Sequence, residues 1–235
     1  EAVGGGEKER ADSDAPAALV AQQADRGGEF AAEFATHQRL LRGGPAATRG
    51  LDLADDGSRS ARVMDAGSAR YSPVLPWLRL YGFGAAPGSL IGINLEFGSQ
   101  VTRDGVAFRY GDVTDTGLPT GHLDAITCMS VIEHGVPLEC FVAESARLLR
   151  PGGVLVVSTD YDQDPPDTTG KVIYGSQVHI FSPDEIRDLV AMADRHGLEL
   201  VGSIDETTLA HSERPVHWAR VDLDYTFILL TFRKR

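Results

Sequence analysis

Short apolar runs alternate with helix-forming segments along the chain from Ala61 to its end. Seven runs have the length and composition of buried strands, and they lie at 61–67, 89–96, 106–115, 123–134, 153–161, 198–203 and 225–234. When helices connect successive strands, the strands pair in parallel, because each connection crosses back over the sheet. The alternation therefore predicts an α/β fold with a doubly wound, mostly parallel seven-stranded sheet.

Residues that satisfy free backbone groups mark the expected helix boundaries. Ser182 stands at an N-cap position, Glu185 follows at N3, and Gly197 stands where that helix must end. Ser72 offers a second N-cap before the segment VLPWLRLYG. A third amphipathic segment, at 137–150, ends at a Pro-Gly-Gly sequence. These signals predict three helices between the strands.

The first 60 residues lack this alternation. Residues 1–16 are charged and glycine-rich, whereas 17–41 carry apolar residues at helical spacing, interrupted by a Gly-Gly pair. We therefore expect a tail and helical extension over 1–60 and a ligand-binding sheet domain over 61–235. The extension either closes over the ligand pocket as a lid or simply packs against an edge of the sheet.

Charge and cysteine usage narrow the functional classes. The chain has 34 Asp and Glu against 22 Lys and Arg, a formal net charge of -12. Such an excess repels a phosphate backbone or an anionic membrane surface, so neither is an expected partner. Cys128 and Cys140 stand in apolar sequence, which predicts two buried thiols in a reducing, cytoplasmic compartment. No apolar run is long enough to span a bilayer.

Polar residues gather where the predicted strands end. Ligands of doubly wound sheets bind outside the carboxyl ends of the strands, so this edge is the expected site. Gly67, Ala69 and Ser72 hold the three positions at which a dinucleotide-binding turn requires glycine. A methyl group at the second position blocks a pyrophosphate, which speaks against NAD or FAD. A P-loop sequence is absent.

Six segments in order resemble the class I S-adenosylmethionine-dependent methyltransferases: VMDAGSA, GINLE, FRYGDVTDTGLP, LDAITCMSVIEH, LLRPGGVLVVSTDY and IFSPDEI. The resemblance runs from Arg62 to the end of the chain. It implies a Rossmann-like fold, S-adenosyl-L-methionine as cofactor and methyl transfer as the activity. Each segment is common alone, and the ordered set carries the resemblance.

The resemblance also implies roles at the strand ends. Asp65 and Gly67 would form the turn beneath the methionine part of the cofactor, and Asp112 would accept from the adenine amino group. Asn94 stands where the family usually has an acidic residue that holds the ribose, and Glu96 could substitute for it. The expected cofactor-binding residues are Asp65, Gly67, Ala69, Asn94, Leu95, Glu96, Asp112, Val113, Met129 and Ser130.

His134 follows the fourth strand and is the candidate catalytic residue. An imidazole titrates near neutral pH and can take a proton from a substrate hydroxyl or amine. The same side chain could instead be a hydrogen-bonding wall of the pocket, because methyl transfer can proceed by positioning alone. Expected substrate contacts are Asp160, Tyr161, Tyr174 and His179, for which structural packing is the competing interpretation.

Four aspartates crowd the segment TDYDQDPPDTTG. Clustered carboxylates can hold a divalent metal ion, but Asp and Pro are also common turn formers. We favour the turn and expect no metal.

The sequence thus predicts a methyltransferase for a small molecule, such as a secondary metabolite, with oxygen as the first-choice acceptor. Two alternatives remain open: a protein of this fold that binds the cofactor but catalyses another reaction such as cyclisation, and a non-catalytic regulatory partner. A homodimer is compatible with the sequence.

Overall fold

The computed structural model describes residues 60–68, 72, 74–80, 82–84, 86–173 and 175–235. The chain divides into two compact units, Glu1–Gly43 and Gly44–Arg235. The expected N-terminal extension and lid lie outside the described residues, apart from Ser60. The fold below is that of the second unit.

One sheet of nine strands forms the centre of this unit, in the order β10-β11-β6-β5-β1-β2-β4-β3, with β9 also paired to β11. The strands are β1 (Val63–Ala66), β2 (Leu90–Asn94), β3 (Val101–Arg103), β4 (Val106–Tyr110), β5 (Leu123–Met129), β6 (Leu149–Tyr161), β9 (Leu198–Leu200), β10 (Val216–Trp218) and β11 (Leu223–Lys234). Strands β4, β2, β1, β5 and β6 are parallel to one another, and β11 is antiparallel to β6 and β9.

The predicted α/β architecture is therefore confirmed, and all seven expected strands are present. The short edge strands β3 and β10 were not predicted, nor was a separate hairpin of β7 (Val172–Ile173) and β8 (Ser176–Gln177). Strand β1 pairs with β2 on one side and β5 on the other. The chain therefore reverses its direction of winding at β1, which is where ligands bind in such sheets.

The helices are α2 (Leu75–Leu80), α3 (Leu138–Leu148), α4 (Pro183–Arg195) and α5 (Glu206–Leu209). The predicted caps are confirmed. Ser182 and Glu185 form a capping box at the start of α4, and Gly197 follows its end with a φ of 76°. At α2, the Ser72 hydroxyl accepts the Leu75 N–H at 2.9 Å.

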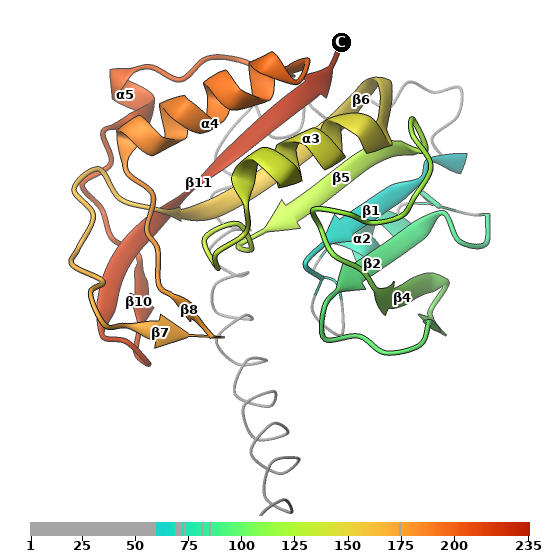
Figure 1. The fold of residues 1–235 in the computed structure, drawn as a ribbon, viewed down its shortest axis with the longest axis horizontal. Coiled ribbons are helices and arrows are strands. Elements are labelled where there is room, and N and C mark those ends of the chain that lie inside the picture. The colour runs from blue at the N-terminus through green and yellow to red at the C-terminus, as the bar shows by residue number, and fades with distance from the viewer. Residues whose placement is uncertain (1–59, 69–71, 73, 81, 85, 174) are drawn as a thin grey trace, which may run out of the picture. The chain divides into compact units, whose positions relative to one another are not determined.

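Helices α3 and α4 lie side by side over one face of the sheet (Figure 1). The main core lies beneath them and includes Phe141, Ile186 and Phe232. Cys128 belongs to this core, but Cys140 is exposed on α3, so the prediction of two buried thiols is half right. The next residues, Phe141 and Val142, face the core, which turns Cys140 away from it. Among the described residues, no helix is both long and apolar enough to cross a membrane.

Candidate functional site

The turn after β1 is held tightly against its neighbours. Gly67 has a φ of +73°, and a Cβ added there would lie 2.4 Å from Val131 Cγ2. Only glycine fits this combination of left-handed backbone and close approach. The Ser68 N–H donates to the Ile93 carbonyl at 2.9 Å, which ties the turn to the end of β2.

Asp65 lies beneath this turn and is 2% exposed. Its Oδ1 accepts a hydrogen bond from Thr127 Oγ1 of β5 at 2.7 Å. Burial raises the pKa of Asp65, and the hydroxyls of Ser72, Thr127 and Ser68 oppose that rise. No described residue donates a hydrogen bond to the other carboxylate oxygen, Oδ2. Asp65 Oδ2 is therefore a buried acceptor beneath the turn, and its hydrogen bond is not made by any described residue.

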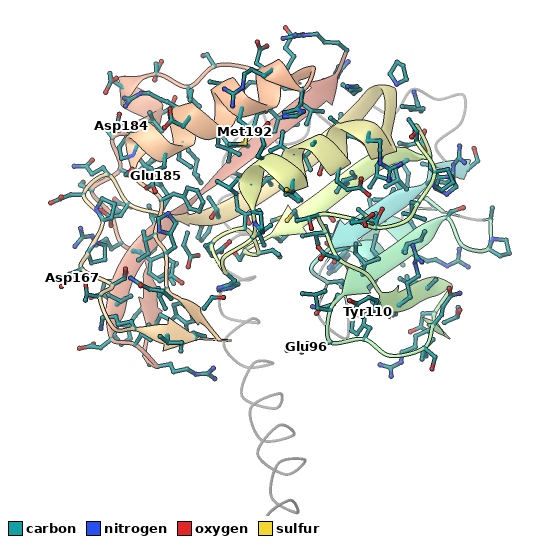
Figure 2. All side chains as sticks on the ribbon, viewed as in Figure 1. Glu96, Tyr110, Asp167, Asp184, Glu185 and Met192 are labelled. Carbon is teal, nitrogen blue, oxygen red and sulfur yellow. The ribbon has the colours of Figure 1, made fainter. Side chains whose placement is uncertain are left out.

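Asn94 joins two turns at this edge, and its expected contact with the cofactor stays a prediction. Its Nδ2 donates to the Ser68 carbonyl at 2.9 Å, and its Oδ1 accepts the Glu96 N–H at 2.9 Å. The side chain thus braces the turn after β1 against the turn after β2. This leaves Leu95, which is 61% exposed, and Glu96 as the outward-facing residues after β2. Glu96 and Tyr110 stand at the ends of β2 and β4 (Figure 2).

The segment after β4 is folded back by its own side chains. Asp112 Oδ1 accepts from the N–H and the hydroxyl of Thr114 at 2.8 and 2.7 Å. Two residues on, Thr116 donates its N–H and its hydroxyl to Glu144 Oε1 of α3, at 2.9 and 2.6 Å. Arg147 completes this clamp with bonds of 2.7 Å to each Glu144 oxygen.

The lowered pKa of Glu144 keeps its carboxylate ionised within this clamp. Burial acts to raise the pKa of Glu144, but the hydrogen bonds from Arg147 and Thr116 outweigh it and lower the pKa. The ionised carboxylate therefore fixes the segment that carries Asp112 and Val113. Val113 itself packs against the main core.

Ser130 directly follows β5 in a strained conformation, with a φ of +51°. Its N–H donates to the Ser158 carbonyl of β6 at 3.1 Å. Its buried hydroxyl oxygen has no hydrogen-bond partner among the described residues. Met129 precedes it as the last, half-buried residue of β5. A second polar group is thus available beside the β1 turn.

His134 is half-buried in the turn that follows. Its ring centroid lies 6.4 Å from that of Trp218 on β10, at an interplanar angle of 63°. Trp218 in turn lies 6.4 Å from Tyr225. An aromatic wall therefore flanks the candidate base, and no sequence motif predicted it.

The expected substrate residues do not come together. Asp160 is buried at the end of β6. Tyr161 is fully buried in the main core, and its hydroxyl donates to the Leu209 carbonyl at 2.5 Å. His179 pairs with Glu185 at 3.0 Å and lies against Phe181. Tyr174 and the cofactor candidate Ala69 lie outside the described residues.

The acidic loop forms its own contacts. Asp162 is buried and accepts two bonds from Arg214, at 2.6 and 3.0 Å. Asp167 accepts the Thr169 N–H at 2.9 Å, as a turn-forming aspartate does. In the described part of the chain, no three His, Cys, Asp or Glu side chains are placed to hold a metal ion. The absence of a metal stays a prediction.

Comparison with known proteins identifies the fold at this edge. Residues 66–157, which include the β1 turn, match the family model described as a methyltransferase domain. This part of the chain is similar to methyltransferase domains, as its resemblance to the class I S-adenosylmethionine-dependent methyltransferases predicts. The family's cofactor is S-adenosyl-L-methionine. The Asp65 carboxylate and the Ser130 hydroxyl, with oxygens not engaged by described residues, suit the charged groups of its methionine part.

Two curated relatives match short stretches of the chain. A probable S-adenosylmethionine-dependent methyltransferase of Mycolicibacterium smegmatis is 43% identical over 54 residues, which cover 23% of this chain and 21% of that protein. A ubiquinone biosynthesis O-methyltransferase of Xanthomonas oryzae pv. oryzae is 42% identical over 55 residues, 23% of each chain. The matches thus span between a fifth and a quarter of these relatives.

A solved structure extends the likeness to the whole fold. The 1,6-didemethyltoxoflavin-N1-methyltransferase of Burkholderia thailandensis, with S-adenosylhomocysteine bound, has a TM-score of 0.50 and 17% sequence identity. The alignment covers 97% of this chain and 93% of that one.

Proposed function

We propose that this chain transfers the methyl group of S-adenosyl-L-methionine to a small molecule, with an oxygen atom as acceptor. The observation that carries the proposal is the set of polar groups around the Gly67 turn, above all the buried Asp65 carboxylate with one oxygen not engaged by described residues. The similarity to an O-methyltransferase supports the acceptor, and the small substrate of the Burkholderia enzyme supports the substrate class.

Each strand end has a part in holding the cofactor. Asp65 and Ser130 bind its methionine part, Glu96 replaces Asn94 at the ribose, and Asp112 accepts from the adenine amino group. Asp112 Oδ1 accepts its two hydrogen bonds from Thr114, so Oδ2 is the oxygen that would accept from the adenine amino group. The remaining expected contacts, at Gly67, Ala69, Leu95, Val113 and Met129, stay predictions.

When bound, the cofactor supplies an electrophilic methyl group. His134 would take the proton of the substrate hydroxyl on an imidazole nitrogen, so that the hydroxyl oxygen could accept this methyl group. Trp218, at 6.4 Å between ring centroids, limits the orientations of the imidazole and keeps water from that side. Tyr161 and His179 each have a partner elsewhere, which favours structural packing for both, and their roles as substrate contacts stay predictions.

The acidic charge favours a neutral or cationic substrate and disfavours nucleic acid and anionic membranes. A cytoplasmic location, a secondary metabolite as substrate and a homodimer stay predictions.

Calorimetric titration with S-adenosylmethionine and S-adenosylhomocysteine tests the cofactor site. We expect Asp112→Ala to weaken binding about tenfold or more, since one bond to a charged group is lost. Asp115→Ala, at an exposed position three residues along the same segment, is the matched control and should bind as the parent does. Failure of the parent chain to bind either compound would overturn the proposal.

Turnover on a panel of phenols and alcohols tests the transfer. We expect His134→Ala to lower kcat by about 10² or more without changing cofactor affinity, while the exposed His211→Ala has no effect. Unchanged turnover would remove His134 from the mechanism. Cofactor binding without methyl transfer to any acceptor would favour the alternative of a different reaction on the same fold.

A further inference from the structure

A hollow lies between the turn that follows β5 and helix α4, on the face of the sheet covered by helices. It is a cavity of about 300 Å³ between the turn after β5, the start of α3, the β7–β8 hairpin and α4. This volume is at the lower end of the range of small-molecule sites. Its apolar lining comes from Ile132, Val136, Leu138, Phe181, Leu189 and Met192. Met192 lies on α4, and Glu185 stands at the start of the same helix (Figure 2).

The charged groups of this cavity are mainly acidic. Its lining includes the carboxylates of Glu133, Glu185 and Asp188 with the imidazole of His179, and no lysine or arginine stands among its described residues. A cation is therefore attracted to the cavity and an anion repelled.

Asp188 is the carboxylate available to a ligand. Glu185 Oε2 accepts hydrogen bonds from the N–H and the hydroxyl of Ser182, at 2.8 and 2.7 Å, within the capping box. Its Oε1 lies 3.0 Å from His179 Nε2. Asp188 stands one turn later on α4 and is exposed at the mouth of the cavity. No Arg, Lys or His in the described part of the chain forms an ion pair with it.

We propose that this cavity binds a small organic ammonium ion with an apolar body. The apolar body packs against Leu138, Phe181 and Met192, and the ammonium group lies at the Asp188 carboxylate. The cavity shares the turn that carries His134 with the cofactor edge, and the rest of its lining comes from the start of α3, the β7–β8 hairpin and α4.

The methionines give a specific readout. The chain has three: Met64 in the core, Met129 at the cofactor edge and Met192 in the cavity. In a sample labelled with ¹³C on the methionine methyl groups, 2-phenylethylammonium should shift the Met192 signal in a saturable way and leave Met64 unchanged. S-adenosylhomocysteine should shift Met129 instead, so failure of this inference and failure of the proposed function are distinguishable.

Variants test the charge and the location. Asp188→Asn should weaken ammonium binding about two- to fivefold, as expected for one exposed ion pair. Asp184→Asn removes the same charge four residues earlier, at a position outside the lining, and should bind as the parent does. Leu138→Trp fills the cavity and should abolish the Met192 shift while the Met64 signal reports an intact core.

The neutral 2-phenylethanol has the same apolar body and should bind more weakly than the ammonium ion. Equal affinities for the two probes, equal effects of the two aspartate substitutions, or a Met192 shift that persists in Leu138→Trp would each overturn the proposal.

Discussion

Replacing Gly67 by alanine should destabilise the fold in two ways, through an unfavourable backbone conformation and through a steric clash. The backbone at Gly67 has a φ of +73°, and an added Cβ would meet Val131 Cγ2 at 2.4 Å and Cγ1 at 2.6 Å. A left-handed conformation costs an alanine about 1–2 kcal/mol. Forcing a methyl group into a filled space costs about 1–3 kcal/mol more. We therefore expect Gly67→Ala to lower the free energy of unfolding by about 2–5 kcal/mol.

Gly170 provides a matched control. Its φ is +74°, and an added Cβ would have no heavy atom within 4 Å. Gly170→Ala should therefore lose only the backbone part, about 1–2 kcal/mol. Val131→Ala in the Gly67→Ala background should recover the steric part, which appears as a coupling of about 1–3 kcal/mol in a double-mutant cycle.

Urea unfolding of Gly67→Ala, Gly170→Ala, Val131→Ala, the double variant and the parent measures these differences from the midpoints and slopes. A typical domain is stable by about 5–15 kcal/mol, so Gly67→Ala should still fold at low denaturant. Equal losses at Gly67 and Gly170, or no coupling between Gly67 and Val131, would refute the reasoning.

Three further substitutions test the rest of the site. The folded pKa of Asp65 is raised above the usual 3.8, so the protonated side chain contributes stability below pH 3.8, and this contribution is lost as the pH rises through the folded pKa. In urea unfolding, Asp65→Asn should therefore become more stable relative to the parent as the pH rises through this range. Parallel stability profiles of the two proteins against pH would contradict this. Asn94→Asp should lower the free energy of unfolding by about 1–3 kcal/mol, because a carboxylate cannot donate to the Ser68 carbonyl, and an unchanged midpoint in urea unfolding would show the brace to be unimportant. Glu144→Gln should cost about 1.5–3 kcal/mol through its weakened bonds to Arg147, measured by urea unfolding at pH 7, where a change within error would exclude the clamp as a stabilising contact.

Local signals in the sequence were sufficient for the larger elements. The residues of the α4 capping box are three apart, so the pattern alone predicts their contact. The five parallel strands are continuous apolar runs and are recognisable for that reason. Strands of three residues, such as β3 and β10, carry too few positions for a pattern.

Because β6 is a nearly continuous apolar run, its sequence did not indicate which face of the sheet each side chain occupies. Asp160 and Tyr161 are adjacent, so they point to opposite faces of the sheet. Both faces of β6 are buried, and apolar residues therefore gave no alternation that could assign either face. The Asn94 brace was equally hidden, because its partner Ser68 is 26 residues away.

Glu144 has a consequence for how the domain opens. Its carboxylate joins Thr116, in the segment that carries Asp112, to Arg147 within α3. The segment and the helix are thereby made into one cooperative unit, in which backbone amides exchange with solvent at a common rate. The adenine side of the site should then be among the slowly exchanging parts of the protein, in contrast to the surface loops that usually line binding sites.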